Sequence, residues 1–128
     1  MKKRIKQWLP LVFWVVLIFG LSSVPRLSSD YPALPTGFDK CAHFFEYTVL
    51  AMLFYRGLRY TNQRVWWLLS LSVVLVGVSV AALDELYQSF IPGRDSSIID
   101  LAADGAGVVA GTCVAVFRYG RRIKGTEE

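Results

Sequence analysis

The sequence predicts an all-α fold, a bundle of four transmembrane helices with a polar site at the outer-leaflet end. The chain is 54% hydrophobic and 19% charged, and its mean hydropathy of +0.41 is too high for an ordinary soluble domain. Its apolar residues are gathered into four runs, each long enough to cross a bilayer. Polar residues cluster at the ends of three of these runs. The length predicts a single membrane domain over residues 1–128.

The first expected span covers residues 8–24 and follows an amino-terminal segment with four basic residues. A basic flank followed by an apolar run is typical both of a cleaved signal peptide and of a membrane anchor. The run has no Ala-x-Ala cleavage sequence, and it contains Trp8 and Trp14. These two features favour an uncleaved helix over a signal peptide.

Three further spans are expected at residues 39–58, 65–90 and 98–119. The segment 22–38 separates the first two spans, because its Pro, Gly and Ser residues interrupt a helix. A Pro-Gly turn within residues 91–97 separates the last two. The sequence therefore predicts four helices that cross the membrane in alternating directions.

The basic residues predict the orientation of these spans. Eleven Lys and Arg residues flank the amino terminus, the connection between the second and third spans, and the carboxyl terminus. Only Arg26, Lys40 and Arg94 lie in the other two connections. Because Lys and Arg are concentrated on the cytoplasmic side of membrane proteins, both termini are expected in the cytoplasm. The three polar clusters then lie at the outer face of the membrane.

The spacing of polar residues predicts that the three clusters form one site. Asp39, His43 and Glu46 share one face of the second span, because they follow each other at intervals of four and three residues. A charged side chain at the centre of a span costs ~2.5–3.5 kcal/mol, so such residues are expected to face the interior of the bundle. The four-residue spacing recurs on the other two spans in Asp84 and Gln88 and in Asp100 and Asp104.

The fourth span contains a Gly-x-x-x-Gly motif on the same face as its aspartates. Gly107 and Gly111 continue the helical spacing of Asp100 and Asp104. Small residues at this spacing allow the backbone of a neighbouring helix to approach closely. We therefore expect a neighbouring helix directly beneath the two aspartates. Asp100, near the start of the span, also fits a helix cap.

The side-chain chemistry predicts three roles. A histidine held by a carboxylate suits acid–base catalysis, and carboxylates with one imidazole suit Mg²⁺, Mn²⁺ or Zn²⁺. An arginine can bind a phosphate or carboxylate through two parallel hydrogen bonds. The predicted catalytic residues are His43, Glu46, Asp84 and Glu85; the predicted substrate-binding residues are Arg94, Gln88, Lys40 and Tyr47; the predicted ligands of a divalent metal ion are Asp39, Asp100 and Asp104.

Structural roles are open alternatives for the same residues. His43 also fits an interior histidine that is hydrogen-bonded to Asp84 or Glu46. Arg94 also fits an interface residue paired with Asp95 or with a lipid phosphate. The two cysteines of the chain are expected to stay free, because their depths in the bilayer differ by about 18 Å, which is far beyond the reach of a disulfide.

Four spaced motifs resemble the VanZ-like family. They are Ser22-Ser23-x-Pro25, Asp39-Lys40-x-x-His43-Phe44-x-x-Tyr47-x-x-Leu50, Asp84-Glu85-x-x-Gln88-x-Phe90-x-Pro92-Gly93-Arg94, and Asp100-x-x-Ala103-Asp104-x-x-Gly107. The resemblance covers about three quarters of the chain. It implies a small helical protein of the bacterial cell envelope, in a family named for low-level resistance to the glycopeptide teicoplanin. Position 104 is often Asn in that family, so Asp104 adds a charge to the site.

Two kinds of function are consistent with these features. In the first, an outward-facing His/Asp/Glu/Arg pocket binds or modifies an anionic lipid or a lipid-linked envelope precursor. In the second, the protein is a non-enzymatic membrane module that organises envelope partners, and its polar residues are structural. Nucleic acid is not an expected partner, because the basic residues flank apolar runs. The expected location is the bacterial cytoplasmic membrane, with several spans.

Overall fold

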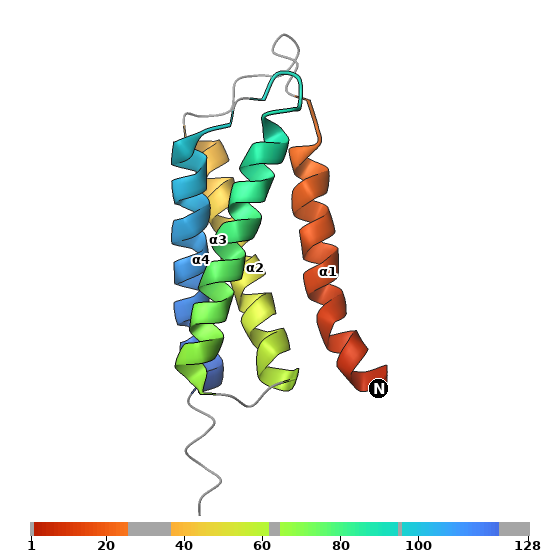
Figure 1. Cartoon of the computed structure of the whole chain (residues 1–128), viewed down its shortest axis with the longest axis vertical. Helices are drawn as coiled ribbons and strands as arrows, with labels where there is room; N and C mark the ends of the chain where they lie inside the picture. Colours follow the sequence, from red (N-terminus) through yellow and green to blue (C-terminus); the bar gives the residue numbers. More distant parts are fainter. Residues whose placement is uncertain (1, 26–36, 62–64, 95, 121–128) are drawn as a thin grey trace, which may run out of the picture.

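The protein is an all-α bundle. The computed structural model describes residues 2–25, 37–61, 65–94 and 96–120. Within them the helices are α1 (Lys2–Ser22), α2 (Phe38–Thr61), α3 (Trp66–Gln88) and α4 (Ile98–Tyr119). The α3–α4 turn lies at the end of the bundle where α1 finishes and α2 begins, and the amino terminus lies at the opposite end (Figure 1). The predicted fold class is confirmed.

The helix bounds follow the predicted spans closely, with one clear difference. α1 begins at Lys2 instead of residue 8, because Lys, Arg and Gln are good helix formers and continue the helix beyond its apolar part. α4 covers the predicted residues 98–119. The connection 26–36 between α1 and α2 lies outside the described residues, so the prediction of a loop there is not addressed.

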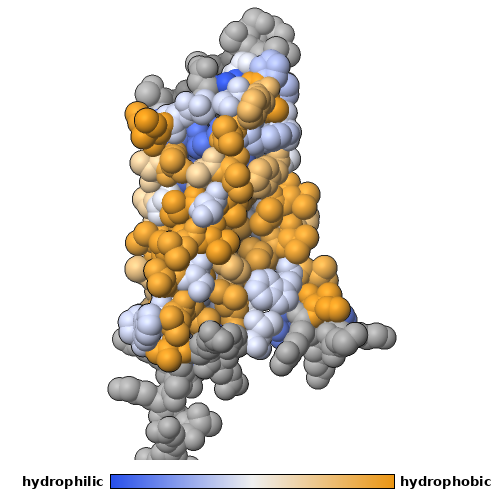
Figure 2. All heavy atoms as spheres, in the orientation of Figure 1, coloured by the Kyte–Doolittle hydropathy of each residue, from blue (hydrophilic) through white to orange (hydrophobic). Residues whose placement is uncertain are grey.

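Three helices are long and apolar enough to cross a membrane: Ile5–Ser22 within α1, Trp66–Gln88 and Ile98–Tyr119. α2 is as long, at 24 residues, but less apolar, because it carries Asp39, Lys40, Glu46, Arg56 and Arg59. Its polar residues His43 and Tyr47 are buried against the other helices. On the visible face, hydrophobic residues cover most of the bundle and hydrophilic residues gather near the α3–α4 turn (Figure 2). The protein is therefore a membrane protein.

Two glycines of α4 allow it to pack directly on the backbone of α2. A Cβ atom added at Gly107 would collide with the carbonyl oxygen of Phe44, and one added at Gly111 would collide with that of Thr48. The Thr48 hydroxyl also donates a hydrogen bond to the carbonyl oxygen of Gly107, at 3.2 Å. The predicted close approach beneath Asp104 is confirmed, and α2 is the helix that makes it.

The α3–α4 turn joins the polar end of α3 to the polar end of α4. Gly93 has a φ of +76°, which a residue with a side chain rarely adopts. Ser97 is the N-cap of α4, since its side chain accepts a hydrogen bond from the Ile99 amide at 3.2 Å. Glu85 of α3 accepts a second one from the Ser97 amide at 2.8 Å. The interpretation of Asp100 as the helix cap was therefore wrong, because Ser97 takes that position.

The hydrophobic core lies below the polar end. Two tyrosine side chains, Tyr47 and Tyr55, are fully buried along α2. Ile18 contributes to this core from α1, Val73 from α3 and Val108 from α4. All four helices therefore share one core, which holds their polar ends at a common level.

Candidate functional site

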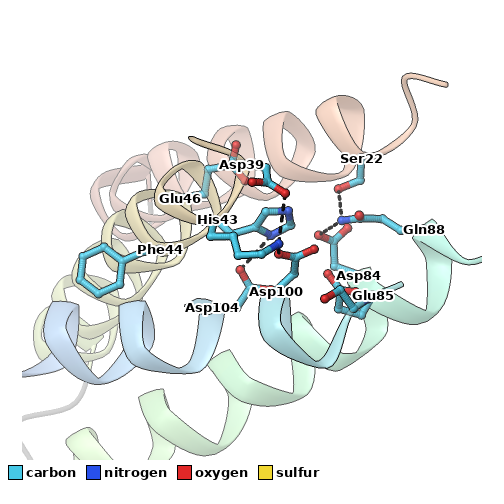
Figure 3. A network of polar contacts seen from close by, with 12 residues as sticks. Ser22, Asp39, His43, Phe44, Glu46, Asp84, Glu85, Gln88, Asp100 and Asp104 are labelled. Carbon is cyan, nitrogen blue, oxygen red and sulfur yellow. Dashed lines mark hydrogen bonds and ion pairs between the residues drawn. The ribbon is translucent and has the colours of Figure 1, made fainter. Parts of the chain in front are cut away.

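The polar side chains of all four helices converge at the end of the bundle that carries the α3–α4 turn. Figure 3 shows the carboxylates and the imidazole of this site pointing toward one another from neighbouring helices. The buried polar residues at this end are Ser22, His43, Asp84, Glu85, Gln88, Asp100 and Asp104. The prediction that three clusters meet in one site is confirmed.

At the centre of the site His43 of α2 contacts Asp104 of α4. Their Nδ1 and Oδ1 atoms are 3.0 Å apart, and the Asp104 side chain is fully buried. The glycine contact between α2 and α4 lies one turn below, which explains why two short side chains can reach each other. As an interior histidine His43 was expected to bind Asp84 or Glu46. Its partner is instead Asp104, so that interpretation named the wrong acid.

Lys40 forms a second ion-pair group closer to the surface. Its Nζ atom lies 3.1 Å from Asp39 of its own helix and also contacts Asp100 of α4. The ammonium group therefore lies between two of the three carboxylates predicted to bind metal. The third carboxylate, that of Asp104, is hydrogen-bonded to His43.

A third group connects α3 with α1. The Gln88 side-chain amide donates to Asp84 Oδ2 at 3.0 Å and to the Ser22 hydroxyl at 3.2 Å. Ser23 and Tyr87 add a hydrogen bond of 2.9 Å between their hydroxyl groups. Gln88, predicted to bind substrate, thus holds the carboxylate of Asp84 and the end of α1 in place.

Arg94 extends from the turn to the end of α1. Its Nη2 and Nε atoms donate to the carbonyl oxygens of Leu21 at 2.8 Å and Val24 at 3.2 Å. The last carbonyl groups of a helix lack partners within it, and a basic side chain satisfies them well. Asp95, the expected partner of Arg94, lies outside the described residues. Arg94 therefore positions α1 in addition to facing the site.

A cavity of about 250 Å³ opens beside these groups. It is lined by Asp39, Lys40, His43, Gln88, Gly93, Arg94, Ser97 and Asp100. A smaller one of about 60 Å³ lies next to it, against Ser22 and Glu46. The predicted site residues that line the larger cavity are Asp39, Lys40, His43, Gln88, Arg94 and Asp100, and Glu46 lines the smaller one. Tyr47 is fully buried on α2.

The potential metal ligands that lie close together in the structure differ from the predicted set. His43, Glu85 and Asp104 each offer one ligand atom, and these atoms all lie within 4.8 Å of one another. Glu85 was expected to act in catalysis, and Asp104 alone belongs to the predicted metal group. Asp39 and Asp100 lie instead at the mouth of the site with Lys40.

Some residues at this end had no predicted role. Ser22 binds Gln88, and the indole of Trp14 donates to the carbonyl oxygen of Glu46 at 2.8 Å. Ser97 caps α4 and places its amide on Glu85. The Ser22-Ser23 pair directly after an apolar run was a usable signal, whereas Trp14 resembled an ordinary residue of a span.

A helical bundle with a buried polar cluster at one end, in which three of the described helices are long and apolar enough to cross a membrane, defines a small integral membrane protein. The family model VanZ/LLP1 matches residues 2–119. The chain therefore belongs to the VanZ/LLP1 family, as its four motifs predicted. No curated protein matches the chain. No solved structure matches it either.

Proposed function

We propose that the cavity beside Lys40 and Arg94 binds the head group of an anionic lipid or of a lipid-linked envelope precursor. The observation that carries this proposal is the cavity itself, a polar hollow of about 250 Å³ at the end of an otherwise apolar bundle. A head group is the polar part of a molecule whose tails lie along the apolar surface of the helices. A lipid can therefore reach the cavity without leaving the membrane.

The charge pattern of the chain supports an outer-leaflet position for this cavity. Along the sequence, eleven of the fourteen Lys and Arg residues lie near the two termini or in and around the connection between α2 and α3. With the positive side in the cytoplasm, both termini are cytoplasmic and the cavity faces outward across the bacterial cytoplasmic membrane. Lipid-linked precursors of the envelope are then among the ligands that reach it.

Two cations face the cavity and suit an anionic head group. Lys40 is held between Asp39 and Asp100, so its ammonium group is already ordered before a ligand arrives. Arg94 is ordered by its bonds to α1. Lys binds phosphate as a point charge and Arg through its planar fork of donors. Ordered cations lose little conformational entropy on binding.

The residues around His43 suit a reaction on the bound head group. Asp104 accepts a hydrogen bond when Nδ1 carries the proton, which leaves Nε2 of His43 as the basic nitrogen. Glu46, Asp84 and Glu85 are further groups able to exchange a proton. In this proposal they modify the head group, and Lys40 and Arg94 hold it.

Lipid binding by purified protein tests the proposal. Protein in detergent is mixed with phosphatidylglycerol or with phosphatidylcholine, and bound lipid is measured by native mass spectrometry. We expect preferential retention of phosphatidylglycerol, reduced about fivefold in Lys40→Gln, since one basic residue contributes about 1 kcal/mol. Lys6→Gln at the other end of the bundle is the control. Equal retention of both lipids by the wild type contradicts the proposal.

The resemblance to a teicoplanin-resistance family provides a readout in cells. Expression of the wild-type protein is expected to reduce teicoplanin susceptibility, and Lys40→Gln is expected to lose this effect while inserting into the membrane at the same level. Susceptibility measured beside the amount of protein in membranes separates loss of function from loss of protein.

A non-enzymatic module is the second proposal, and it is favoured by the interhelical contacts. Many of the polar residues join two helices: Lys40 and His43 contact α4, Gln88 contacts α1, and Arg94 joins the turn to α1. If stability is their purpose, His43→Ala should lower the melting temperature and the function together. Function lost at an unchanged melting temperature would exclude this alternative.

A further inference from the structure

We propose that His43, Glu85 and Asp104 form a binding site for one divalent transition-metal ion, Zn²⁺ or Mn²⁺. The three side chains come from three different helices, α2, α3 and α4. Their potential ligand atoms all lie within 4.8 Å of one another. His43 also lines the head-group cavity, but ion binding by the three side chains does not depend on a head group there.

Two carboxylates of this group are buried and only partly hydrogen-bonded. Glu85 is 6% exposed and Asp104 is fully buried. Glu85 Oε1 and Asp104 Oδ2 have no hydrogen-bond partner among the described residues. Burying a carboxylate oxygen without a partner is costly, so each of these atoms requires a ligand or a proton.

The charge of the group also favours a cation. Among the residues described, Lys40 pairs with Asp39 and Asp100, and His43 pairs with Asp104. None of these ion pairs joins Glu85 or Asp104 to a lysine or an arginine. With a neutral His43 the group carries two buried negative charges. A divalent cation neutralises both.

The donor set suits a small divalent ion. In a tetrahedral site, donor atoms about 2.1 Å from the ion lie about 3.4 Å from one another. The ligand atoms here lie within 4.8 Å of one another, so ion binding draws the three side chains closer together by roughly 1 Å. One imidazole and two carboxylates are borderline to hard ligands, which favour Zn²⁺ and Mn²⁺. Three protein ligands also leave a coordination position open for water or for a bound molecule.

Neighbouring contacts, one hydrogen bond and one helix packing contact, already position two of the ligands. The Ser97 amide donates to Glu85 Oε2 at 2.8 Å, which holds the carboxylate of Glu85 in place. Asp104 is brought to His43 by the close glycine packing of α4 on α2. Ligands that are held in place by a second set of contacts are typical of metal sites.

Metal binding by the purified protein tests this site. The protein in detergent is treated with a chelator, incubated separately with ZnCl₂ and MnCl₂, and analysed by elemental mass spectrometry after removal of free ion. We expect about one ion per chain, and a loss of affinity of about 10- to 100-fold in Asp104→Asn and in Glu85→Gln. Asp39→Asn, which removes a nearby carboxylate that binds Lys40, should retain wild-type affinity.

Each result decides the proposal. Absence of stoichiometric binding of both ions to the wild type overturns it. Equal affinity in the wild type, Asp104→Asn and Glu85→Gln overturns it as well, because the ion then binds elsewhere. If Asp104→Asn fails to fold by circular dichroism, Glu85→Gln and the wild type still decide. Binding is measured without added lipid, so failure of the head-group proposal leaves this test unaffected.

Discussion

His43 is the only histidine of the chain, and it lies where three helices bring their carboxylates together. It is 7% exposed, yet it also lines the cavity, so the ring contacts both the buried acids and the open side of the site. Asp104 orients the ring through Nδ1. A residue in this position can pass a proton, or hold a metal ion, between the interior and a ligand in the cavity.

Replacing this ring tests its chemical role. We expect His43→Gln to abolish the effect on teicoplanin susceptibility, since glutamine keeps a hydrogen-bonding group near Asp104 but neither exchanges protons near neutral pH nor ligates metal well. The melting temperature in detergent should fall only slightly, because Asp104 keeps a donor. The susceptibility assay and thermal unfolding are run on the same variant. If His43→Gln changes teicoplanin susceptibility as much as the wild-type protein does, His43 has no chemical role.

Lys40 also combines two roles at the residue level. It forms ion pairs with Asp39 and Asp100 at the mouth of the site. Both pairs are partly exposed to solvent, so they contribute about 1 kcal/mol or less to stability. Stability alone is therefore a weak reason for a lysine in this position, whereas an ordered cation at a cavity mouth suits an anionic ligand.

At the level of the elements, the α2–α4 contact sets the geometry of the site. Its effect is tested by Gly107→Ala, where the added methyl group meets the carbonyl oxygen of Phe44 and forces the helices apart. We expect the unfolding free energy to fall by about 1–3 kcal/mol, which is the typical cost of overpacking a protein interior. The measurement is unfolding in detergent by circular dichroism.

Gly105→Ala is the matched control for this substitution. It lies two residues earlier on the same helix, and a Cβ atom there meets nothing within 4 Å. Alanine is favoured over glycine in a helix by roughly 0.5–1 kcal/mol, so this variant should be as stable as the wild type or slightly more stable. Equal destabilisation by both substitutions would show that the contact with α2 is not responsible.

The connection between the α3–α4 turn and α1 depends on one side chain. Arg94→Lys keeps the positive charge but loses the planar fork that reaches two carbonyl oxygens, of Leu21 and Val24. We expect a stability loss of about 1–2 kcal/mol, since each such bond to a charged donor contributes about that much or more. Arg118→Lys, at an exposed position near the end of α4, is the control. Unchanged unfolding of the Arg94 variant would contradict this role.

The helices and the close packing at the glycines of α4 were predictable because their signals are local. Apolar runs define spans, and the spacing of Gly107 and Gly111 defines a face of one helix. The partner of His43 and the placement of Arg94 on α1 were not predictable, because helical spacing tells which face a residue occupies but not which helix lies opposite. Ser97 as the N-cap was missed because Asp100, three residues later, carries an equally good capping side chain.

At the scale of the whole molecule, polar and apolar residues are segregated along the bundle axis. One end gathers the buried carboxylates, the imidazole and the cavity. Most of the basic residues that the structure describes lie toward the opposite end. Six acidic residues of the described part of the chain lie toward the polar end: Asp39, Glu46, Asp84, Glu85, Asp100 and Asp104. Because acids contribute little to membrane insertion, their position is better explained by the site than by topology.

The two native cysteines test this orientation without any new residue. Cys41 is exposed in the first turns of α2 at the polar end, and Cys113 is exposed in the apolar part of α4. With the polar end outward, a membrane-impermeant maleimide added to spheroplasts should label Cys41, whereas Cys113 faces lipid and should stay unlabelled. Cys41→Ser should abolish labelling and Cys113→Ser should leave it unchanged. If Cys41 is labelled only in inverted vesicles, the polar end faces the cytoplasm. Lipids of the outer leaflet then cannot be ligands of the site.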